Sequence, residues 1–505
     1  MMARGIGEVG SVGLALLLTA VPAGLDAQGY RVRLDTRFQS VEYRGVQLDS
    51  ILATATVAGP NGGPETPDGY AVNCQPGDAY CTFFREGPRR VGAPLVATAD
   101  ATAWGFGVRG LSAHATARLG YDLSSDNAWV GVDPALQLVV GYVEYAAPRF
   151  TARAGRQLLA SRLGSTGFDG GSLTWRLPRQ GIDLSGFLGW GLARGVALPV
   201  TSPALNPLDE FQPEQRQIVA GLEGGWSTRI GDVRLFYQRE VDPHIDKFVS
   251  ERVAISGSVR PAAGWAVSGG ADYDMAFGWW GSADLSVAYS TRGVAATLEA
   301  RRYRPHFDLW TIWGAFSPVP YHSLRGNVTW RPSRPIQLHA RGEVYRFDPA
   351  DVSAPLVPYE TDGYRSELGA TIEPAKGVTL DAGLTREFGP GAASAGTGGS
   401  VTYSPTRSAH VTLYGSSLDR PLEFRYSESA LRMLGFDGAA DVNDRVRLSL
   451  GAIRYAEERR RPDAAAFDWT QWRITAGVVV LFAHGGDLEN LPPAIRRMPG
   501  GRNAR

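Results

Sequence analysis

Hydrophobic and polar residues alternate along most of the chain with a period of two. The alternation is clearest from Asp468 to Phe482, where one face is apolar and the other carries polar residues or glycine. The apolar face consists of Trp472, Ile474, Ala476, Val478, Val480 and Phe482. A period of two is that of a β-strand, in which successive side chains point to opposite faces. This stretch is therefore predicted to be a strand with one apolar face.

The same division recurs in many other segments. They include residues 30–38, 111–121, 182–190, 233–237, 265–273, 285–289, 294–300, 336–344, 378–384 and 446–452. In residues 137–145 and 150–158 both faces carry apolar side chains, so their register stays open. In a soluble sandwich each apolar face would meet a second sheet, but no layer is left over to cover these faces. The apolar faces are therefore expected to meet lipid.

Strands that face lipid satisfy their backbone hydrogen bonds only in a closed barrel. We therefore predict an all-β fold, a transmembrane antiparallel up-and-down β-barrel. Short turns are expected near residues 110, 148, 179–180, 231–232, 262–263, 292–293, 333–334, 375–376, 406–407 and 443–444, and longer connections at 193–216, 304–321, 348–362 and 389–399. Membrane barrels have short periplasmic turns and long extracellular loops, so this rhythm predicts the orientation and about 22 strands, in a range of roughly 18 to 24.

The last of these segments resembles the terminal strand of bacterial outer-membrane β-barrel proteins. Phe482 stands in the aromatic end position, and Val480, Val478 and Ala476 precede it on the same face. In that class the aromatic residue is usually the last of the chain, whereas here residues 483–505 follow as an expected flexible periplasmic tail. The resemblance implies a porin-like protein in the outer membrane of a Gram-negative cell, with outer-membrane lipid around it and the barrel-assembly machinery as a partner of its C-terminal strand.

Residues 1–27 have the pattern of a signal peptide. A positive residue, Arg4, precedes a short apolar run at 12–21, and small residues offer a cleavage site that ends at Ala27. Residues 28–482 are then expected to form the barrel. Cys74 and Cys81, the two cysteines of the chain, predict one disulfide, as is typical of an exported protein.

The first connection of the barrel, residues 43–97, is long and departs from strand alternation. A wide barrel leaks unless its lumen is filled, so we expect this segment to fold inward as a constriction. Arg85, Arg89 and Arg90 would anchor it on lumen carboxylates such as Asp272, Asp284 or Glu299. The alternative is an exposed surface loop with an incidental disulfide.

Composition narrows the function classes. The chain has 51 basic and 51 acidic side chains, so net charge does not indicate nucleic acid as a partner. No window approaches the roughly 20 apolar residues of a membrane helix. The mean hydropathy of −0.16 suits a barrel, because strands that meet lipid on one side only are half polar.

Sites for catalysis, metals or cofactors are not indicated. The seven histidines are scattered, and none stands with cysteine or carboxylate at a spacing that specifies zinc. His306 and Asp308 form only a lone His-x-Asp pair. No nucleophile elbow and no phosphate-binding glycine loop occurs. We therefore expect neither an enzyme nor a bound cofactor.

Charged residues on the face opposite the apolar one are the better candidates, because they would line the lumen. The candidates for selectivity are Arg33, Asp35, Arg37, Arg118, Asp272, Asp284, Glu299, Arg301, Arg341 and Glu343. One interpretation is that opposite charges on neighbouring strands form ladders that stiffen the wall. The other is that their field selects solutes, as rings of charge do in pores.

The connection at residues 302–322 is rich in aromatic side chains. It contains Tyr303, Phe307, Trp310, Trp313, Phe316 and Tyr321. Large apolar rings are seldom left in water, so they either pack on loops and in the barrel mouth or form a stacking platform for a sugar or an apolar solute.

These observations lead to a porin-like channel through which small polar solutes diffuse, either as a monomer or as an oligomer. The alternatives are a structural barrel that does not conduct and, less favoured, an outer-membrane enzyme. Because fold does not establish function, the step from barrel to channel rests on class analogy.

Overall fold

The computed structural model describes residues 29–59, 62–124, 135–192, 217–241, 243, 248–304, 320–348, 361–389, 392–419, 428–461 and 469–484. The expected signal peptide lies outside these residues, and so does the expected tail apart from its first two residues. The first strands are β1 (Gly29–Leu52), β2 (Val57–Ala58), β3 (Pro64–Glu65), β4 (Val72–Asn73), β5 (Tyr80–Gly92), β6 (Pro94–Trp104), β7 (Leu111–Asp122), β8 (Leu136–Ala146), β9 (Phe150–Ser161), β10 (Gly164–Leu177) and β11 (Ile182–Gly191), with a short 3₁₀ helix at Ala53–Ala55. They are followed by β12 (Ile218–Ser227), β13 (Gly231–Val241), β14 (Phe248–Val259), β15 (Trp265–Asp274), β16 (Trp279–Ser290), β17 (Val294–Tyr303), β18 (Tyr321–Ser333), β19 (Ile336–Phe347), β20 (Asp362–Ala375), β21 (Val378–Gly389), β22 (Ala392–Tyr403), β23 (Ala409–Asp419), β24 (Glu428–Asn443), β25 (Val446–Arg461) and β26 (Trp469–His484).

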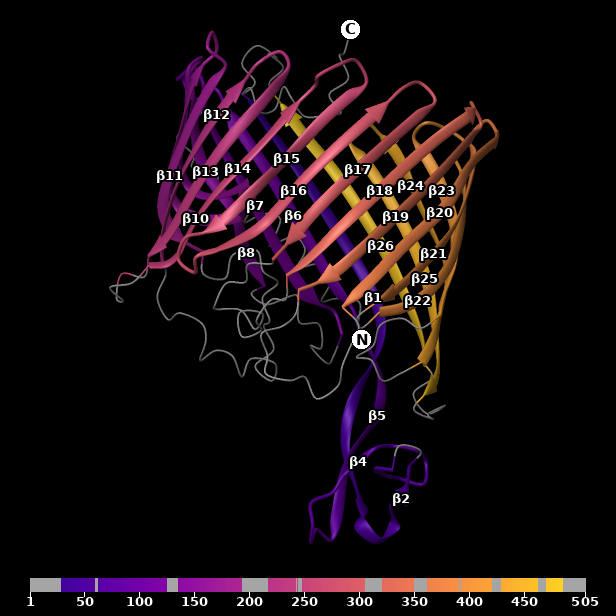
Figure 1. Ribbon diagram of the computed structural model, residues 1–505. Helices are drawn as coiled ribbons and strands as arrows, with labels where there is room; N and C mark the ends of the chain where they lie inside the picture. Colours follow the sequence, from indigo (N-terminus) through magenta and orange to yellow (C-terminus); the bar gives the residue numbers. More distant parts are fainter. Residues whose placement is uncertain are drawn as a thin grey trace, which may run out of the picture.

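The strands form one closed antiparallel barrel (Figure 1). The main sheet has 24 strands, and without β4 and β5, which lie outside the wall, 22 remain: β1 and β6 to β26. Closure is made by β1, which pairs with β26 from Tyr30↔His484 to Val41↔Arg473 and with β6 along its other edge. The predicted fold and strand number are thus confirmed. Among the described residues no helix is long and apolar enough to cross a membrane.

The ends of the barrel differ in their connections. The ten turns at the end that holds Tyr30 and His484 are all short, and each predicted turn lies within two residues of an observed one. The connections at the opposite end are longer, apart from those between β9 and β10, β13 and β14, β15 and β16, and β21 and β22. Because membrane barrels have short periplasmic turns and long extracellular loops, the end that holds Tyr30 and His484 is periplasmic and the opposite end is extracellular.

The outer surface of the wall is apolar and carries a girdle of aromatic side chains near each end. Exposed rings near the periplasmic end are Tyr30, Tyr145, Trp175, Trp226, Trp265, Trp330, Tyr403 and Phe482. Those near the extracellular end are Tyr121, Trp190, Trp280, Phe388 and Trp472. Exposed leucine and valine side chains, for example Leu285, Leu298 and Leu450, lie between them. An apolar band between two aromatic girdles is the lipid-facing surface of a membrane barrel.

A two-stranded arm projects from the extracellular end (Figure 1). It is built by β1, which continues beyond the wall and pairs with β5 from Val41↔Gly92 to Leu52↔Tyr80. Its tip is closed by β2, β3, β4 and the predicted disulfide between Cys74 and Cys81. Cys81 is fully buried there. The Tyr70 hydroxyl donates a hydrogen bond of 2.6 Å to Glu86.

The structure contradicts the expectation that residues 43–97 narrow the lumen. This segment extends away from the barrel as an arm. β1 pairs with β6 within the wall and continues beyond it paired with β5, which leads directly into β6. Arg85 pairs with Asp49 on the arm itself, at 2.9 Å, and not with a lumen carboxylate. Arg89 and Arg90 are exposed on the arm, where it leaves the wall.

Candidate functional site: a narrowed lumen

A short hairpin leaves the wall and folds into the lumen. β9 pairs with β8 only as far as Arg156, and β10 pairs with β11 only from Phe168 onward. Between these points β9 and β10 stay paired with each other up to Ser161↔Gly164. Residues 157–167, the inward hairpin, are therefore held by each other and not by the neighbouring strands.

The tip of the inward hairpin contacts a distant part of the wall. Arg162 forms an ion pair of 2.5 Å with Asp284 on β16. The carbonyl of Leu163 accepts a hydrogen bond of 2.9 Å from Arg252 on β14. The Thr166 hydroxyl donates to Gln238 on β13, at 3.0 Å. These contacts join strands that lie several positions apart in the sheet, so the hairpin spans part of the lumen.

Glycines allow this path. Gly155 has φ +127°, and a Cβ there would lie 2.3 Å from the carbonyl oxygen of Gly141, so β9 bends where only glycine fits. Gly270, on β15, leaves the space that the guanidinium of Arg162 occupies, since a Cβ there would lie 2.7 Å from Nη1 of Arg162.

A small core under the hairpin explains why alternation fails in β9. Phe168 is fully buried and stacks on Phe187 at 5.0 Å between ring centroids. Gln157, also fully buried, donates to the carbonyl of Gly170 and accepts from the Ser172 hydroxyl at 2.6 Å. Leu163 is 8% exposed. Apolar residues therefore occur on the lumen side as well, because protein and not water covers them.

A polar recess of about 160 Å³ adjoins the hairpin. Its polar lining includes Thr151, Arg153, Thr174, Arg176, Ser185 and Glu223. Arg153 pairs with the buried Glu144 at 2.7 Å, and Arg176 donates to the Thr151 hydroxyl at 2.9 Å. These arginines are thus held in place by the wall. The recess offers donors and acceptors to a small polar solute.

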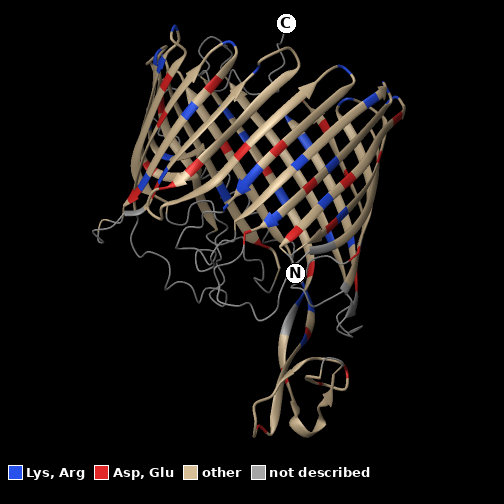
Figure 2. Ribbon diagram, viewed as in Figure 1, with Lys and Arg blue, Asp and Glu red and all other residues tan. Residues whose placement is uncertain are grey.

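Opposite charges form a ladder across five strands of the lumen wall. Directly paired positions on β17 to β21 carry Glu299, Arg325, Glu343, Arg365 and Glu387. Arg325 lies 4.0 Å from Glu299 and 3.0 Å from Glu343. Arg365 lies 3.8 Å from Glu343 and 2.6 Å from Glu387. Figure 2 shows acidic and basic residues alternating on neighbouring strands of the wall.

The other candidate lumen residues are dispersed around the wall. Arg33 and Arg37 both pair with Asp35, at 3.7 and 3.0 Å. Asp272 accepts a hydrogen bond from the amide of Ser282 at 2.9 Å.

Three further candidates stand at separate places. The Arg301 guanidinium lies over the ring of Tyr303, 4.5 Å from its centroid. Arg118 and Arg341 lie on the lumen faces of β7 and β19. The structure thus joins Glu299 with Glu343 through Arg325, but it does not gather the ten candidates into one site. Their role in selectivity stays a prediction.

Aromatic rings gather at the extracellular mouth of the lumen. Tyr303 lies 5.5 Å from Tyr321, which is in turn 5.5 Å from Phe347 and 6.5 Å from Tyr345. Arg365 lies over the ring of Tyr345 at 4.9 Å. The predicted aromatic residues Phe307, Trp310, Trp313 and Phe316 lie outside the described residues, so the stacking platform stays a prediction.

Within the part of the chain that the structure describes, no group of three or more His, Cys, Asp or Glu side chains is placed to hold a metal ion. His306 and Asp308 lie outside that part. Sequence reasoning missed the inward hairpin, although the mixed faces of residues 150–158 and the glycines at 155 and 164 were its visible signals.

No family model matches the chain, and no curated protein matches its sequence. Solved structures with a similar arrangement include the Acinetobacter baumannii protein OccAB4, with 8% identity and a TM-score of 0.40 over 91% of this chain and all of that one. A BenF-like porin from Pseudomonas fluorescens Pf-5 has 10% identity and a TM-score of 0.38 over 90% of this chain and 99% of that one. The siderophore receptor PirA from Pseudomonas aeruginosa has 8% identity and a TM-score of 0.42 over 89% and 80%.

The closed wall satisfies every condition that lipid imposes on a β-sheet. It has no free edge within the barrel, its outer face is apolar between two girdles, and its inner face carries the charges. Barrels of this kind with an even strand number belong to bacterial outer membranes. The chain is therefore an outer-membrane β-barrel protein, the class that its last strand resembles.

Proposed function

We propose that the protein is a porin-like channel through which small polar solutes diffuse across the outer membrane, with the inward hairpin as its constriction. The observation that supports this most is the set of contacts from Arg162, Leu163 and Thr166 to β16, β14 and β13. A barrel of this strand number is wide enough to need such a filler. A hairpin that occupies only part of the lumen leaves a passage beside it.

The charge arrangement favours weak selection by charge. The ladder on β17 to β21 pairs each carboxylate with an arginine, so a solute meets both signs at short range. Paired charges of opposite sign have fields that largely cancel beyond a few ångströms in water. Size and hydrogen bonding, and not net charge, would then decide which solutes pass.

Conductance of the purified protein in a planar bilayer tests the proposal. We expect discrete channels with a small ratio between cation and anion permeability. A variant in which residues 159–166 are replaced by a two-residue turn should conduct severalfold more and admit larger uncharged sugars. A matched variant with a substitution in the arm, Leu48→Ser, should conduct like the wild type. A barrel that inserts but shows no channels would contradict the proposal.

The arm favours a second candidate, a scaffold for a partner outside the cell. Leu48 and Phe84 are paired neighbours on it, and they are 59% and 61% exposed. Leu52 and Tyr80 form the next exposed apolar pair on the same face. A scaffold that does not conduct would insert normally and fail the bilayer test.

A further inference from the structure

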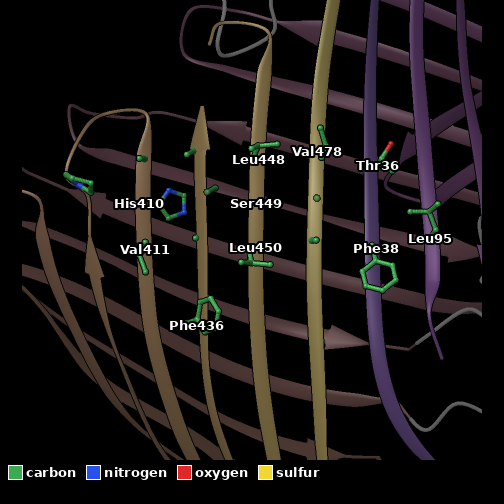
Figure 3. Close-up of a pocket in the computed structure, with 17 residues that line it drawn as sticks. Thr36, Phe38, Leu95, His410, Val411, Phe436, Leu448, Ser449, Leu450 and Val478 are labelled. Carbon is green, nitrogen blue, oxygen red and sulfur yellow. The ribbon is translucent and has the colours of Figure 1, made fainter. Parts of the chain in front are cut away.

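The outer surface of the barrel has an apolar groove that crosses the closure of the wall. It extends over β23, β24, β25, β26, β1 and β6 and encloses about 730 Å³. Figure 3 shows Phe38, Leu448, Leu450, Val478 and other side chains around it. The hollow arises where small residues replace large ones on the lipid-facing side, namely Thr36, Gly438, Ala440 and Ala476.

Three arginines lie beyond the groove, toward the extracellular end of the same strands. Arg44 on β1 stands directly opposite Arg89 on β5, where the arm leaves the wall. Arg454 on β25 stands directly opposite Trp472, a residue of the extracellular girdle. All three arginines are exposed, and among the described residues none of them has an ion-pair partner. The carboxylate of Glu42, on the same face of β1 between Phe38 and Arg44, accepts a hydrogen bond of 3.3 Å from the backbone amide of Trp472. Like charges that face each other across two strands are destabilising by themselves, so this pairing favours an anion between them.

The separation between the groove and the arginines matches the separation between the acyl chains and the headgroup of a lipid. Phe38 and Arg44 lie on the same face of β1 and are six positions apart, which is about 20 Å along a strand. With the usual tilt of barrel strands this is about 15 Å along the membrane normal. The apolar band of such barrels is about 25 Å tall, so a residue near its middle places the arginines just outside it.

We propose that this surface binds one phosphate-bearing lipid of the outer leaflet. Its acyl chains lie in the groove, and its phosphate is held by Arg44 and Arg89, with Arg454 beside them. Arginine guanidinium groups match phosphate oxygens in bidentate hydrogen bonds, which neither water nor a zwitterionic headgroup replaces equally well. The site does not depend on whether the lumen conducts.

A second copy of the chain is a poorer occupant for two reasons. In a two-fold interface each groove would face another groove, and two hollows leave a void between them. The same symmetry would bring two clusters of unpaired arginines together. A flexible chain with an anionic head fits both features at once.

Native mass spectrometry of the full-length protein in detergent tests the site with two lipids that share their chains. The probes are dioleoylphosphatidic acid, which carries a phosphate monoester, and dioleoylphosphatidylcholine. The wild type should retain the first about tenfold more strongly than the second, since a hydrogen bond to a charged group contributes enough for such a ratio. Arg44→Gln with Arg89→Gln should abolish this preference. Ala440→Leu with Ala476→Leu should lower the retention of both lipids because it fills the groove.

Matched variants on β21, two strands away from the edge of the groove on β23, serve as controls. Arg386→Gln removes an exposed arginine near the extracellular end of β21, and Ala382→Leu enlarges a small residue on the same strand. Both should leave lipid retention unchanged, and heat-modifiable migration shows that every variant is folded. Equal retention of the two lipids by the wild type would overturn the proposal. Displacement of phosphatidic acid by millimolar inorganic phosphate would also overturn it. So would groove variants that lose self-association but retain the lipid.

Discussion

The guanidinium of Arg162 lies 2.5 Å from the carboxylate of Asp284, although 122 residues separate them in the chain. The two side chains join the tip of the inward hairpin to β16. Both side chains are partly buried: Arg162 is 17% exposed and Asp284 is 30% exposed. Because the pair holds the tip of the hairpin against β16, it would also set the width of the proposed passage beside the hairpin.

Arg162→Ala should release the tip of the hairpin. We expect a larger and noisier single-channel conductance, because the contact with Asp284 is lost and the hairpin moves within the lumen. Asp284→Asn should have a similar, smaller effect. Asp381→Asn is the matched control, since Asp381 accepts a hydrogen bond from Thr371 on the wall and has no contact with the hairpin. Conductance traces of Arg162→Ala that equal the wild type would argue against the hairpin as the constriction.

Gly155→Val should disturb the bend that lets β9 leave the wall. The residue has φ +127° and no room for a Cβ, so the substitution should cost about 1 to 3 kcal/mol in the free energy of unfolding. Gly171→Ala is the control on the neighbouring strand, where a Cβ would have its nearest contact at 3.6 Å. Thermal unfolding followed by circular dichroism compares the two variants. A larger loss for Gly171→Ala would show that the bend does not depend on glycine.

Ile474→Arg tests the lipid-facing surface. Ile474 is exposed on the outer face of β26, so an arginine there should destabilise the barrel by about 2–4 kcal/mol if it lies at the bilayer midplane. Thr475→Arg, on the lumen face of the same strand, should have a mild effect. Urea titration of protein folded in lipid vesicles measures both. If the wild-type protein were recovered from a soluble periplasmic fraction, the membrane assignment itself would be wrong.

Glu343→Gln should weaken the ladder at its centre. The Glu343 side chain is 1% exposed and serves both Arg325 and Arg365, so its loss leaves two guanidinium groups without their shared carboxylate. We expect a loss of about 1 to 3 kcal/mol in the free energy of unfolding. Glu367→Gln, whose side chain is 41% exposed and lies 3.7 Å from His339, should change it by less than about 1 kcal/mol.

Tyr70 should make the tip of the arm sensitive to alkali. Burial and the hydrogen bond to Glu86 raise the pKa of its phenol to about 12, from an ordinary value of 10.0. The folded tip therefore binds this proton more tightly than the unfolded chain does. Its contribution to stability is complete below pH 10 and is lost as the pH rises toward 12. Protease cleavage within the arm should increase over that range in the wild type and change less in Tyr70→Phe.

Much of the wall could be predicted because lipid imposes a simple rule on each strand. Alternation identified β26 and its outward residues from Trp472 to Phe482, and the turn near Arg292 and Gly293 was predicted from the break in that pattern. The arm was not predicted as a hairpin because water surrounds both of its faces. No burial pattern then distinguishes a ribbon from a loop.

The site was harder to predict than the wall, because its contacts depend on register and on a path through the lumen. The ladder requires Glu299, Arg325 and Glu343 to be directly opposite, and a shift of one position would turn one of them toward lipid. The contact of Arg162 with Asp284 depends on a bend that local pattern only suggests through Gly155. The sequence names the residues, and the packing decides which of them meet.

The continuity of β1 has a mechanical consequence. One strand runs from Gly29 in the wall to Leu52 near the tip of the arm, and within the wall it is bonded to β26 on one edge and β6 on the other. In antiparallel pairs the hydrogen bonds lie perpendicular to the strands, so a pull along the arm loads all of them at once in shear instead of opening them one by one. Tension applied to the arm outside the cell would thus be transmitted to the pairing of β1 with β26 that closes the barrel, without separating the two strands one hydrogen bond at a time.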